Sequence, residues 1–368
     1  MEKKRLILAD CMYPMLNCSG NTELLYECID IFNLLAAVGE AVIFKSQLSN
    51  KLYAVGYNSR GQLGNNSTIN QCIPVAVCGN HNFNKISGGN GFALAVDENG
   101  KSWAWGYNRE VGGAFGCLGD NSGTNKSTPV AICGNHTFCH ISAGFSVQSG
   151  AIDNNGKAWA WGSNNNGSLG IGNSDFGFTT CTPTAIYGNH TFCNIAMGSH
   201  SLAIDNHNKL WVWGDVIIPN KSTPTEVIGV QTFCKIAVGV FGTVALDNNA
   251  KGWYVSNTSP FSPVAMPYNH SYCDISVGRY WLAIATDNET YSWGENNKGQ
   301  LGDNTIISKT SPIKVCGEHL FRCVVTDDLY NGYALDDQGQ VWGWGYNRDG
   351  QLGIGNTTDK STPVAVCH

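Results

Sequence analysis

The chain has 368 residues, of which 42% are hydrophobic and 14% are charged, and its formal net charge at pH 7 is −6. Its one basic cluster is Lys3, Lys4 and Arg5, whereas a duplex binder needs a basic patch, so we expect no nucleic-acid partner. No window approaches the ~20 apolar residues that a membrane-spanning helix needs, so we expect no membrane partner. Asp10 and Pro14 interrupt the basic, apolar start expected of a secretory signal, which favours a cytoplasmic location.

Residues 1–30 match no repeated phrase, and they are predicted to form an extension that either caps the domain or docks on a neighbouring copy. Residues 31–368 repeat a unit of about fifty residues with four apolar phrases separated by turn signals, and are predicted to form one domain. The third unit shows all four phrases. "FCHISAG" comes just before "GAIDNNG", and "KAWAWG" and then, after a loop, "CTPTAIYG" follow. Four short strands per unit of this length are typical of a β-propeller blade.

The third phrase of the unit is the clearest guide to the number of blades. It alternates large apolar residues with small ones, which places its two tryptophans on one face of a strand. Its seven copies begin, in chain order, at Lys51, Lys101, Lys157, Lys209, Lys251, Thr290 and Gln340. The sequence therefore predicts an all-β fold, a seven-bladed β-propeller of four-stranded blades.

The two ends of the repeated region predict how the ring closes. Gly39 and Gly56 are separated by the same 17 residues as Gly89 and Gly106, so the first unit has the first three strands of a blade. The chain ends on "KSTPVAVCH", which reads as a fourth strand. We therefore expect the C-terminal strand to join the N-terminal blade, which would leave no open edge.

A loop phrase that recurs after the third strand brings a family resemblance. It reads "YNSRGQLGNN" from Tyr57, "ENNKGQLGDN" from Glu295 and "YNRDGQLGIGN" from Tyr346. Together with phrases such as "MGSHSLAI" from Met197, it resembles the repeats of the regulator of chromosome condensation family, which are seven-bladed propellers. The resemblance covers more than nine tenths of the chain. It implies the fold, but a fold does not by itself imply a function.

Cysteines, asparagines and histidines all follow the repeat. Most of the 15 cysteines occupy repeated strand positions and are predicted to be buried thiols, although Cys133 with Cys139 and Cys316 with Cys323 could pair. The Asn-x-Ser/Thr triplets are interpreted as turn residues instead of glycan acceptors. One histidine recurs per unit, at His81, His136, His190, His270 and His319, and is predicted to cap loop backbone instead of binding metal. The turns that begin at Asp153 and its relatives are predicted to be hairpin turns, and we expect no cofactor and no metal.

The residues that vary between units, rather than those that repeat, are the candidates for specificity. They follow the first strand of each unit and mix aromatic with charged residues, as protein interfaces do. The predicted partner-binding set is Glu40, Asn90, Phe145, His200, Phe241, Arg279, Tyr280, Trp281 and Tyr330. Phe115 and Phe178, in two lengthened loops, are further predicted contacts. The alternative interpretation is that these side chains only fill the inner channel.

The family resemblance adds one comparison for this loop. In the plant ultraviolet-B photoreceptors, which the chain resembles, a Gly-Trp-Arg-His-Thr phrase forms the dimer face, and similar bacterial β-lactamase inhibitors bind partners through one face. Only "GRYW" from Gly278 approaches that phrase, so light sensing is not predicted.

Three function classes remain open from the sequence. With no phosphate loop, nucleophile elbow or H-E-x-x-H pair, the chain is predicted not to be an enzyme. A non-enzymatic propeller that binds a protein partner is favoured. The alternatives are an architectural subunit that self-assembles through residues 1–30, and a guanine-nucleotide exchange factor for a small GTPase, as in the namesake of the family.

Overall fold

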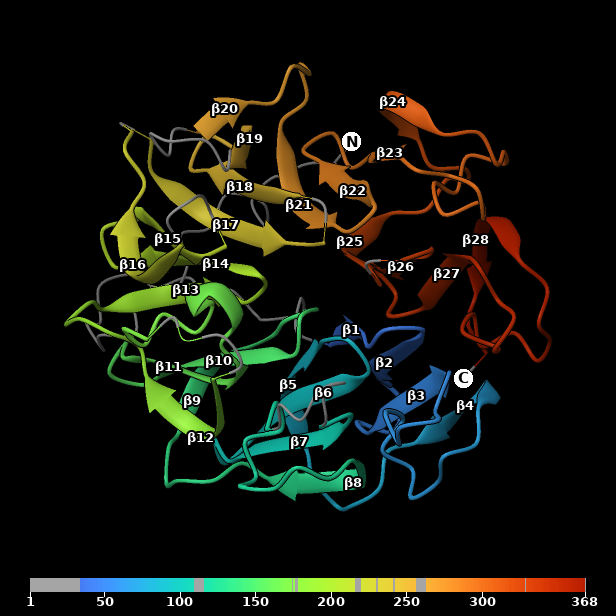
Figure 1. Ribbon diagram of the computed structural model, residues 1–368. Coiled ribbons are helices and arrows are strands. Elements are labelled where there is room, and N and C mark those ends of the chain that lie inside the picture. The colour runs from blue at the N-terminus through green and yellow to red at the C-terminus, as the bar shows by residue number, and fades with distance from the viewer. Residues whose placement is uncertain are drawn as a thin grey trace.

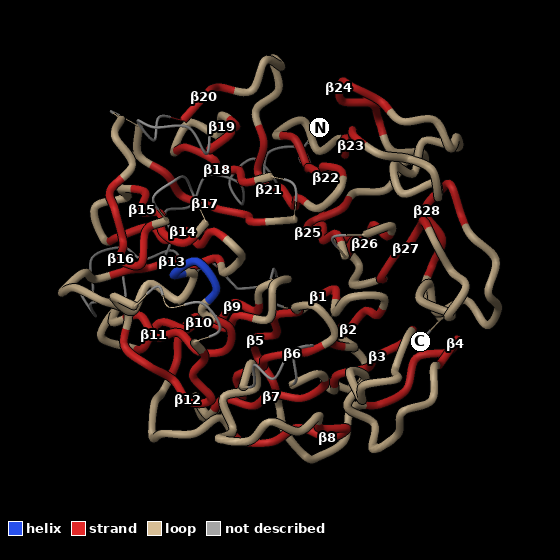
Figure 2. The backbone as a smooth tube through the Cα atoms, in the orientation of Figure 1, coloured by secondary structure: helices blue, strands red, loops and turns tan. Residues whose placement is uncertain are grey.

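The computed structural model is a ring of seven four-stranded antiparallel sheets, arranged like the blades of a propeller around a central axis (Figure 1). It describes residues 34–108, 116–173, 175, 178–215, 220–229, 231–240, 242–255, 263–327 and 329–367. The predicted all-β class and the seven four-stranded blades are confirmed. Figure 2 shows how little helix there is, a single short 3-10 turn at Asn165–Gly167 within the described residues.

Each blade consists of four strands that follow one another in the chain. Blade 1 contains β1 (Leu35–Ala37), β2 (Ala41–Lys45), β3 (Leu52–Gly56) and β4 (Gln71–Ala76). Blade 2 contains β5 (Phe83–Gly88), β6 (Phe92–Asp97), β7 (Ser102–Gly106) and β8 (Lys126–Ala131). Blade 3 contains β9 (Phe138–Ala143), β10 (Gln148–Asp153), β11 (Ala158–Ser163) and β12 (Thr179–Ala185). Blade 4 contains β13 (Phe192–Ala196), β14 (His200–Asp205), β15 (Leu210–Gly214) and β16 (Lys221–Glu226).

The remaining three blades repeat this order and complete the ring. Blade 5 contains β17 (Phe233–Val238), β18 (Thr243–Asp247), β19 (Gly252–Val255) and β20 (Pro263–Ala265). Blade 6 contains β21 (Tyr272–Val277), β22 (Tyr280–Ala285), β23 (Thr290–Gly294) and β24 (Lys309–Lys314). Blade 7 contains β25 (Phe321–Thr326), β26 (Asn331–Asp336), β27 (Val341–Gly345) and β28 (Lys360–Ala365).

The predicted exchange of the C-terminal strand is wrong. β28 pairs with β27 inside blade 7, and blade 1 takes its outer strand from its own sequence, with Tyr53 of β3 opposite Ala76 of β4. The phrase "QCIPVA" at residues 71–76 is the fourth strand that the sequence interpretation took to be missing. Each blade is therefore complete in chain order, and the ring closes by packing of blade 7 against blade 1.

The third strand of a blade shows why the tryptophans repeat. In β11, Trp159 and Trp161 lie on one side of the strand, and Trp161 is completely buried against blade 2. The Trp161 Nε1 donates a hydrogen bond to the Cys117 carbonyl of blade 2, at 2.9 Å. Burial of such a ring contributes about 3–5 kcal/mol, so the repeated indoles hold neighbouring blades together.

The loop after the third strand reaches over the next blade, and we call this segment the clasp loop. In blade 1 its Leu63 is fully buried, and the Asn66 amide donates to the Ser127 carbonyl of blade 2 at 2.8 Å. Equivalent bonds run from Asn121 to Cys181, from Gly172 to Ser222, from Asn304 to Ser361 and from Gly355 to Cys72. The last of these bonds joins blade 7 to blade 1, so the clasp that joins other neighbouring blades also closes the ring.

A buried asparagine sets the shape of the clasp loop in blades 1, 2, 3, 6 and 7. In blade 6, Asn296 is fully buried, and its Oδ1 accepts the Leu301 amide at 2.9 Å. Its Nδ2 donates to the Thr305 carbonyl and the Ile307 carbonyl, both at 3.2 Å. Buried polar groups are costly unless bonded, so this side chain fixes the path of the whole loop. Asn58, Asn108, Asn164 and Asn347 make the same bond to the leucine of their own loops.

Candidate functional site

The antiparallel order of the strands gives the ring two different faces. The turn between the first and second strands and the clasp loop lie at one end of each blade, which we call the loop face. The turn between the second and third strands and the connection to the next blade lie at the other end, which we call the hairpin face. These faces differ in how strictly the sequence repeats.

The hairpin face is built from one repeated arrangement. In blade 2 the Asp97 Oδ1 accepts the amides of Asn99 and Lys101, and its Oδ2 accepts the Trp103 Nε1 at 2.9 Å. Asp153, Asp205, Asp247 and Asp336 bond the outer indole of their own blades in the same way. The prediction that these aspartates form hairpin turns is therefore confirmed.

The repeated histidines of the hairpin face stack on rings. The His81 ring centroid is 3.8 Å from that of Trp103, and His136, His190 and His319 approach Trp159, Trp211 and Trp342 to 4.0, 4.1 and 3.9 Å. In blade 6, His270 approaches Tyr291 to 4.3 Å. The histidines thus cover the outer aromatic ring of five blades, which differs from the predicted capping of loop backbone.

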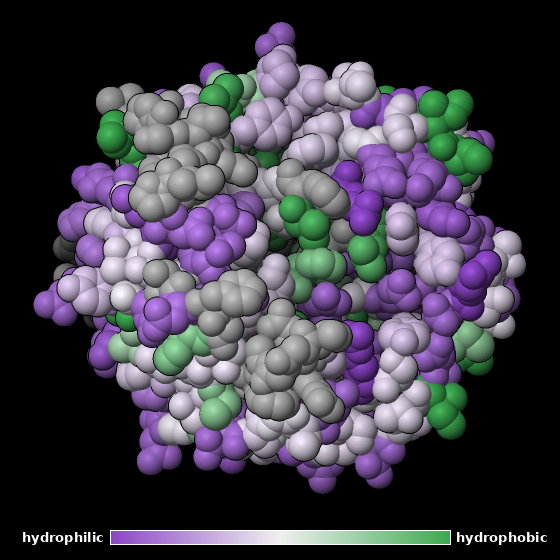
Figure 3. Space-filling view, viewed as in Figure 1, coloured by the Kyte–Doolittle hydropathy of each residue, from purple (hydrophilic) through white to green (hydrophobic). Residues whose placement is uncertain are grey.

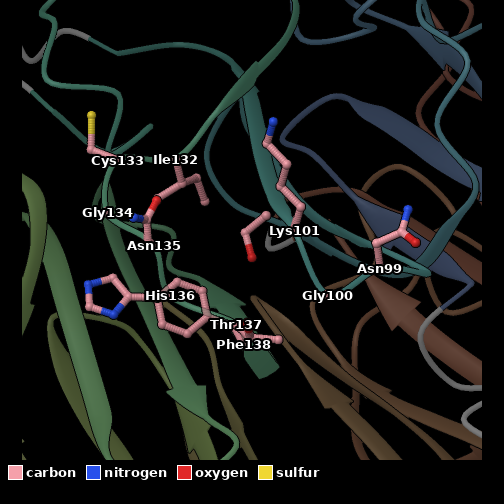
Figure 4. A pocket seen from close by; sticks show the side chains of 11 residues that line it. Asn99, Gly100, Lys101, Ile132, Cys133, Gly134, Asn135, His136, Thr137 and Phe138 are labelled. Carbon is pink, nitrogen blue, oxygen red and sulfur yellow. The ribbon is translucent and has the colours of Figure 1, made fainter.

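One shallow pocket lies on the hairpin face between blades 2 and 3. It has a volume of about 220 Å³, and Figure 4 shows Asn99 and Lys101 on one side with Cys133, Asn135 and His136 on the other. Ligand pockets are usually ~300–1,000 Å³. The lining residues are the turn and connection that every blade repeats, so the pocket is part of the scaffold.

The predicted partner-binding residues lie at the loop face or near it, and they do not all reach the surface. The described members that stay partly exposed in the turns are Glu40, Asn90, Phe145, Arg279 and Tyr330. Glu40, Asn90 and Phe145 follow β1, β5 and β9, so they surround the same end of the channel. Figure 3 shows hydrophobic side chains near the centre of the ring with hydrophilic ones around them.

Tyr280 is a core residue, contrary to the role predicted for it. It is 0% exposed and packs in the core shared by blades 6 and 7. Trp281 is partly buried against the core shared by blades 5 and 6, where it stacks on Trp293 with ring centroids 6.0 Å apart and an interplanar angle of 3°. The "GRYW" phrase therefore leaves its arginine and its tryptophan partly exposed.

His200 also serves the scaffold. Its Nε2 hydrogen-bonds the Thr243 hydroxyl of blade 5, and burial lowers the pKa of His200. Phe178 is 38% exposed, and its carbonyl accepts the Asn164 amide at 3.0 Å. The predicted contacts Phe115 and Phe241, and the extension at residues 1–30, lie outside the described residues.

A group of aromatic and charged side chains gathers on the loop face of blades 6 and 7. Arg279 lies 3.5 Å from a carboxylate oxygen of Glu295, and its guanidinium is 5.7 Å from the centroid of the Tyr330 ring. The Tyr330 ring lies 6.0 Å from that of Tyr346, and the Lys298 ammonium is 5.3 Å from the Tyr346 centroid. These five residues link two blades through half-exposed rings and cations, and we call them the tyrosine cluster.

A second cation and ring pair extends this composition to blades 1 and 2. The Arg60 guanidinium lies 4.1 Å from the centroid of the Tyr107 ring. Arg60 lies in the clasp loop of blade 1, and Tyr107 is the first residue of the clasp loop of blade 2. Tyr346 occupies the equivalent first position in blade 7. Arginine and tyrosine are the residues most enriched at the centres of protein interfaces.

Asp327 is a buried carboxylate at the end of β25, beside the tyrosine cluster. Its Oδ1 accepts the amides of Leu329, Tyr330 and Asn331 at 2.8–2.9 Å, so it shapes the turn that presents Tyr330. Burial, and to a smaller extent the negative charge of Glu40, raise the pKa of Asp327 to about 7, although the three backbone hydrogen bonds act to lower it. Burial, and then the charge of Asp349, raise the pKa of Glu40 as well.

The sequence interpretation missed Asp327 and Tyr346. Asp327 follows a first-strand phrase, "FRCVVTD", in which the usual glycine of the turn is replaced, and that departure from the repeat is the signal that could have found it. Tyr346 stands in the repeated "YN" phrase, so repetition concealed it. Its partner Tyr330 was predicted.

The described cysteines are thiols, as predicted, but only Cys117 and Cys323 among them are buried, which differs from the prediction. The twelve cysteines within the described ranges carry thiols, including Cys133, Cys139, Cys316 and Cys323 of the two considered pairs. The Cys139 Sγ lies 3.3 Å from the Asp153 carbonyl, which it can reach as a weak donor. The part of the chain that the structure describes contains no helix long and apolar enough to cross a membrane.

The fold and its clasps define a class, a seven-bladed propeller whose blades are complete and in which five blades carry a Gly-x-Leu-Gly clasp loop. The pattern of the regulator of chromosome condensation (RCC1) repeat matches residues 49–96, 155–204, 287–325 and 338–368, and a second pattern of the same repeat matches residues 83–110. The chain is therefore a propeller built from RCC1 repeats.

Curated relatives and solved structures agree with this assignment. The chain is 25% identical to the ultraviolet-B receptor UVR8 of Arabidopsis thaliana over 84% of its own length and 64% of the receptor, and 26% identical to human E3 ubiquitin-protein ligase HERC2 over 89% of its length and 6% of the ligase. It thus spans less than two thirds of either relative. Human WBSCR16 has a TM-score of 0.66 at 16% identity, covering 79% of this chain and 83% of that one, and Prp20p of Saccharomyces cerevisiae has 0.52 at 20%, covering 91% and 76%.

Proposed function

We propose that this propeller is a non-enzymatic protein-binding module whose contact surface is the loop face of blades 6, 7, 1 and 2. The observation that carries the proposal is the tyrosine cluster, in which the partly exposed side chains of Arg279, Tyr330 and Tyr346 lie next to one another. Large, preorganised rings with few rotatable bonds bind at low entropic cost. The cluster also differs from blade to blade, whereas the hairpin face repeats.

One observation on the relatives and one on this chain support a protein as the partner. One RCC1 structure was solved with Kap60 bound, and Prp20p is described with its binding to Gsp1p and histones. The net charge of −6 disfavours an extended phosphate backbone as the ligand, because such binding relies on neutralising phosphates. A cytoplasmic location remains part of this proposal.

The test is a binding measurement with a partner captured from the native source by the immobilised full-length chain. The variant combines Arg279→Ala, Tyr330→Ala and Tyr346→Ala, and the matched control is Leu48→Ser, an exposed residue of the β2–β3 turn on the hairpin face. We expect at least a tenfold loss of affinity for the variant and no loss for the control, since central aromatic and arginine residues supply most interface energy. Equal affinities would place the contact elsewhere.

The same material tests the two other function classes. Light scattering measures the mass of the full-length chain, and a mass of 39.6 kDa is the value expected of a monomer. A regular multimer that dissociates when residues 1–30 are removed would support the architectural role. Faster release of a labelled guanine nucleotide from a captured small GTPase would support exchange activity.

A further inference from the structure

The junction of blades 7 and 1 on the loop face brings acidic side chains together from distant parts of the sequence. Glu40 lies in the turn between β1 and β2, and Asp327 directly follows β25, the strand against which β1 packs. The two carboxylates interact electrostatically, and Asp349 of the blade 7 clasp loop interacts with Glu40. Figure 1 shows β1 and the ends of β25 and β26 beside one another near the centre of the ring.

Asp327 is held in place and still offers an acceptor. The residue is 3% exposed, and its Oδ1 accepts three backbone amides. Its Oδ2 is buried and has no hydrogen-bond partner among the described residues. Buried carboxylate oxygens rarely stay unbonded, because the desolvation cost is then not compensated. The position of this oxygen is therefore preorganised for a donor.

The donor does not come from the described part of this chain. None of the ion pairs among the described residues uses Glu40, Asp327 or Asp349. These pairs join Lys126 to Asp120, Lys209 to Glu226, Lys235 to Asp274, Arg279 to Glu295, Lys309 to Asp303 and Lys314 to Glu289. Glu40 repels both Asp327 and Asp349, and the Arg348 charge, which acts on the neighbouring Tyr346, is paired with none of the three carboxylates in these ion pairs. A cation placed among them would remove that repulsion.

Aromatic rings stand beside these carboxyl groups. The phenol of Tyr346 interacts electrostatically with Glu40 and Asp349, and that of Tyr333 interacts with Asp327 and Glu40. Tyr330, in the turn that Asp327 shapes, lies against Tyr346. Carboxylates next to ring faces suit a long cationic side chain, since the rings pack against its stem and attract its charge.

We propose that Glu40 and Asp327, with Asp349 at the edge, form an acidic notch that accepts a lysine or arginine side chain of a protein partner. This inference rests on the proposed function, because it assigns the chemistry of one contact within the same loop face. The Asp327 Oδ2 accepts the incoming N–H donor, Glu40 supplies the second carboxylate, and Tyr346 lies alongside. The notch thereby selects for a basic residue on the partner.

The test uses a short probe in place of the unidentified partner. The acetylated and amidated peptides Gly-Arg-Gly and Gly-Lys-Gly are titrated into the full-length chain carrying 13C-labelled tyrosine, and the ring signals of Tyr330 and Tyr346 are followed by NMR. The neutral peptide Gly-Gln-Gly is the matched probe. We expect saturable shifts with the basic peptides that weaken as salt is added, and none with the neutral peptide.

Two conservative variants identify the carboxylates. Asp327→Asn keeps an oxygen for the three backbone amides but removes the charge, and Glu40→Gln changes a half-exposed residue, so it remains informative if the first variant folds poorly. Each variant is expected to bind the basic peptides with at least tenfold lower affinity. Glu98→Gln, an exposed carboxylate of the β6–β7 turn on the hairpin face, is the control and is expected to leave binding unchanged.

The outcomes separate this inference from the proposed function. Equal shifts with the basic and neutral peptides, no shifts at all, or undiminished binding by both Asp327→Asn and Glu40→Gln would overturn the notch. A partner that requires the tyrosine cluster but binds Asp327→Asn and Glu40→Gln unchanged would overturn the notch and retain the binding face. Specific binding of the basic peptides, together with a partner that ignores the loop face, would retain the notch and overturn the proposed function.

Discussion

The hairpin face and the loop face are made by the same strands, yet their sequences obey different constraints. On the hairpin face an aspartate, an outer tryptophan and a histidine recur with nearly constant geometry, such as Asp97, Trp103 and His81 in blade 2. On the loop face the turn residues change from blade to blade. In blade 6 the turn carries Arg279, and in blade 7 it carries Tyr330, which lies against that arginine. Repetition here accompanies packing, and divergence accompanies exposed rings and uncompensated charge.

The largest expected effect comes from breaking a repeated contact between blades. Trp161→Ala removes a completely buried ring and one of the two hydrogen bonds that the Cys117 carbonyl accepts, the other coming from the Ser149 hydroxyl. We expect a loss of about 3–5 kcal/mol in the free energy of unfolding, measured by urea denaturation. Trp159→Ala, on the same strand but partly exposed, is the comparison, and an equal loss there would contradict the assignment of the inner indole to the core.

The second prediction concerns the pH dependence that Asp327 imposes. Its pKa is about 7 in the folded chain and ~3.9 in an unfolded one, so the folded state binds the extra proton between these values and stability falls as the pH rises through them. Asp327→Asn lacks this penalty. We therefore expect the free energy of unfolding of Asp327→Asn, minus that of the natural chain, to rise by roughly 2–4 kcal/mol between pH 4 and pH 8.

Thermal unfolding of both chains across this pH range provides the measurement for Asp327. The titratable groups that act on Asp327 are Glu40, from the neighbouring turn, and Tyr333, from β26. Glu40→Gln should therefore reduce the pH dependence without abolishing it. A difference between Asp327→Asn and the natural chain that stays constant with pH would show that Asp327 ionises normally.

A smaller effect is expected from a single clasp loop. Asn296→Ala leaves the Leu301 amide and two loop carbonyls without their buried partner. The expected cost is about 1–3 kcal/mol in the free energy of unfolding. Its neighbour Asn297 is exposed, so Asn297→Ala should cost much less, and similar costs for the two variants would argue against the clasp.

The smallest effect on stability is expected where the effect on binding is largest. Tyr346→Ala on the loop face removes a half-exposed ring and should change the free energy of unfolding by about 0.5 kcal/mol. Differential scanning calorimetry compares it with the natural chain. A loss as large as that of Trp161→Ala would assign the tyrosine cluster to the scaffold and remove the contrast between the two faces.

The sequence predicts most of the fold because each blade repeats its physical constraints. Period-two alternation identified the strands, the glycine and asparagine phrases identified the turns, and seven copies gave the blade count. Closure of the ring was mispredicted because "QCIPVA" lacks the usual threonine before its proline, so blade 1 seemed to lack its outer strand. Strand pairing depends on which edge is nearest in space, which a local phrase does not specify.

The residues of the proposed binding face were predicted less completely, for reasons that particular residues show. Variation after the first strand identified Arg279 and Tyr330 but also Tyr280, whose side chain points into the core because alternate strand residues face opposite sides. Asp327 was missed because its importance comes from burial and from Glu40, which is nearly three hundred residues away in the chain. A local sequence pattern predicts neither the burial of Tyr280 nor the interaction of Asp327 with Glu40.

Hydrogen–deuterium exchange on the complex with a captured partner tests the central claim most directly. If the loop face binds the partner, peptides that cover residues 327–331 and 346–350 will exchange more slowly in the complex, while those covering the hairpin turns at residues 97–101 and 153–157 will not change. Protection confined to the hairpin turns would contradict the account, since the repeated face would then be the one that binds.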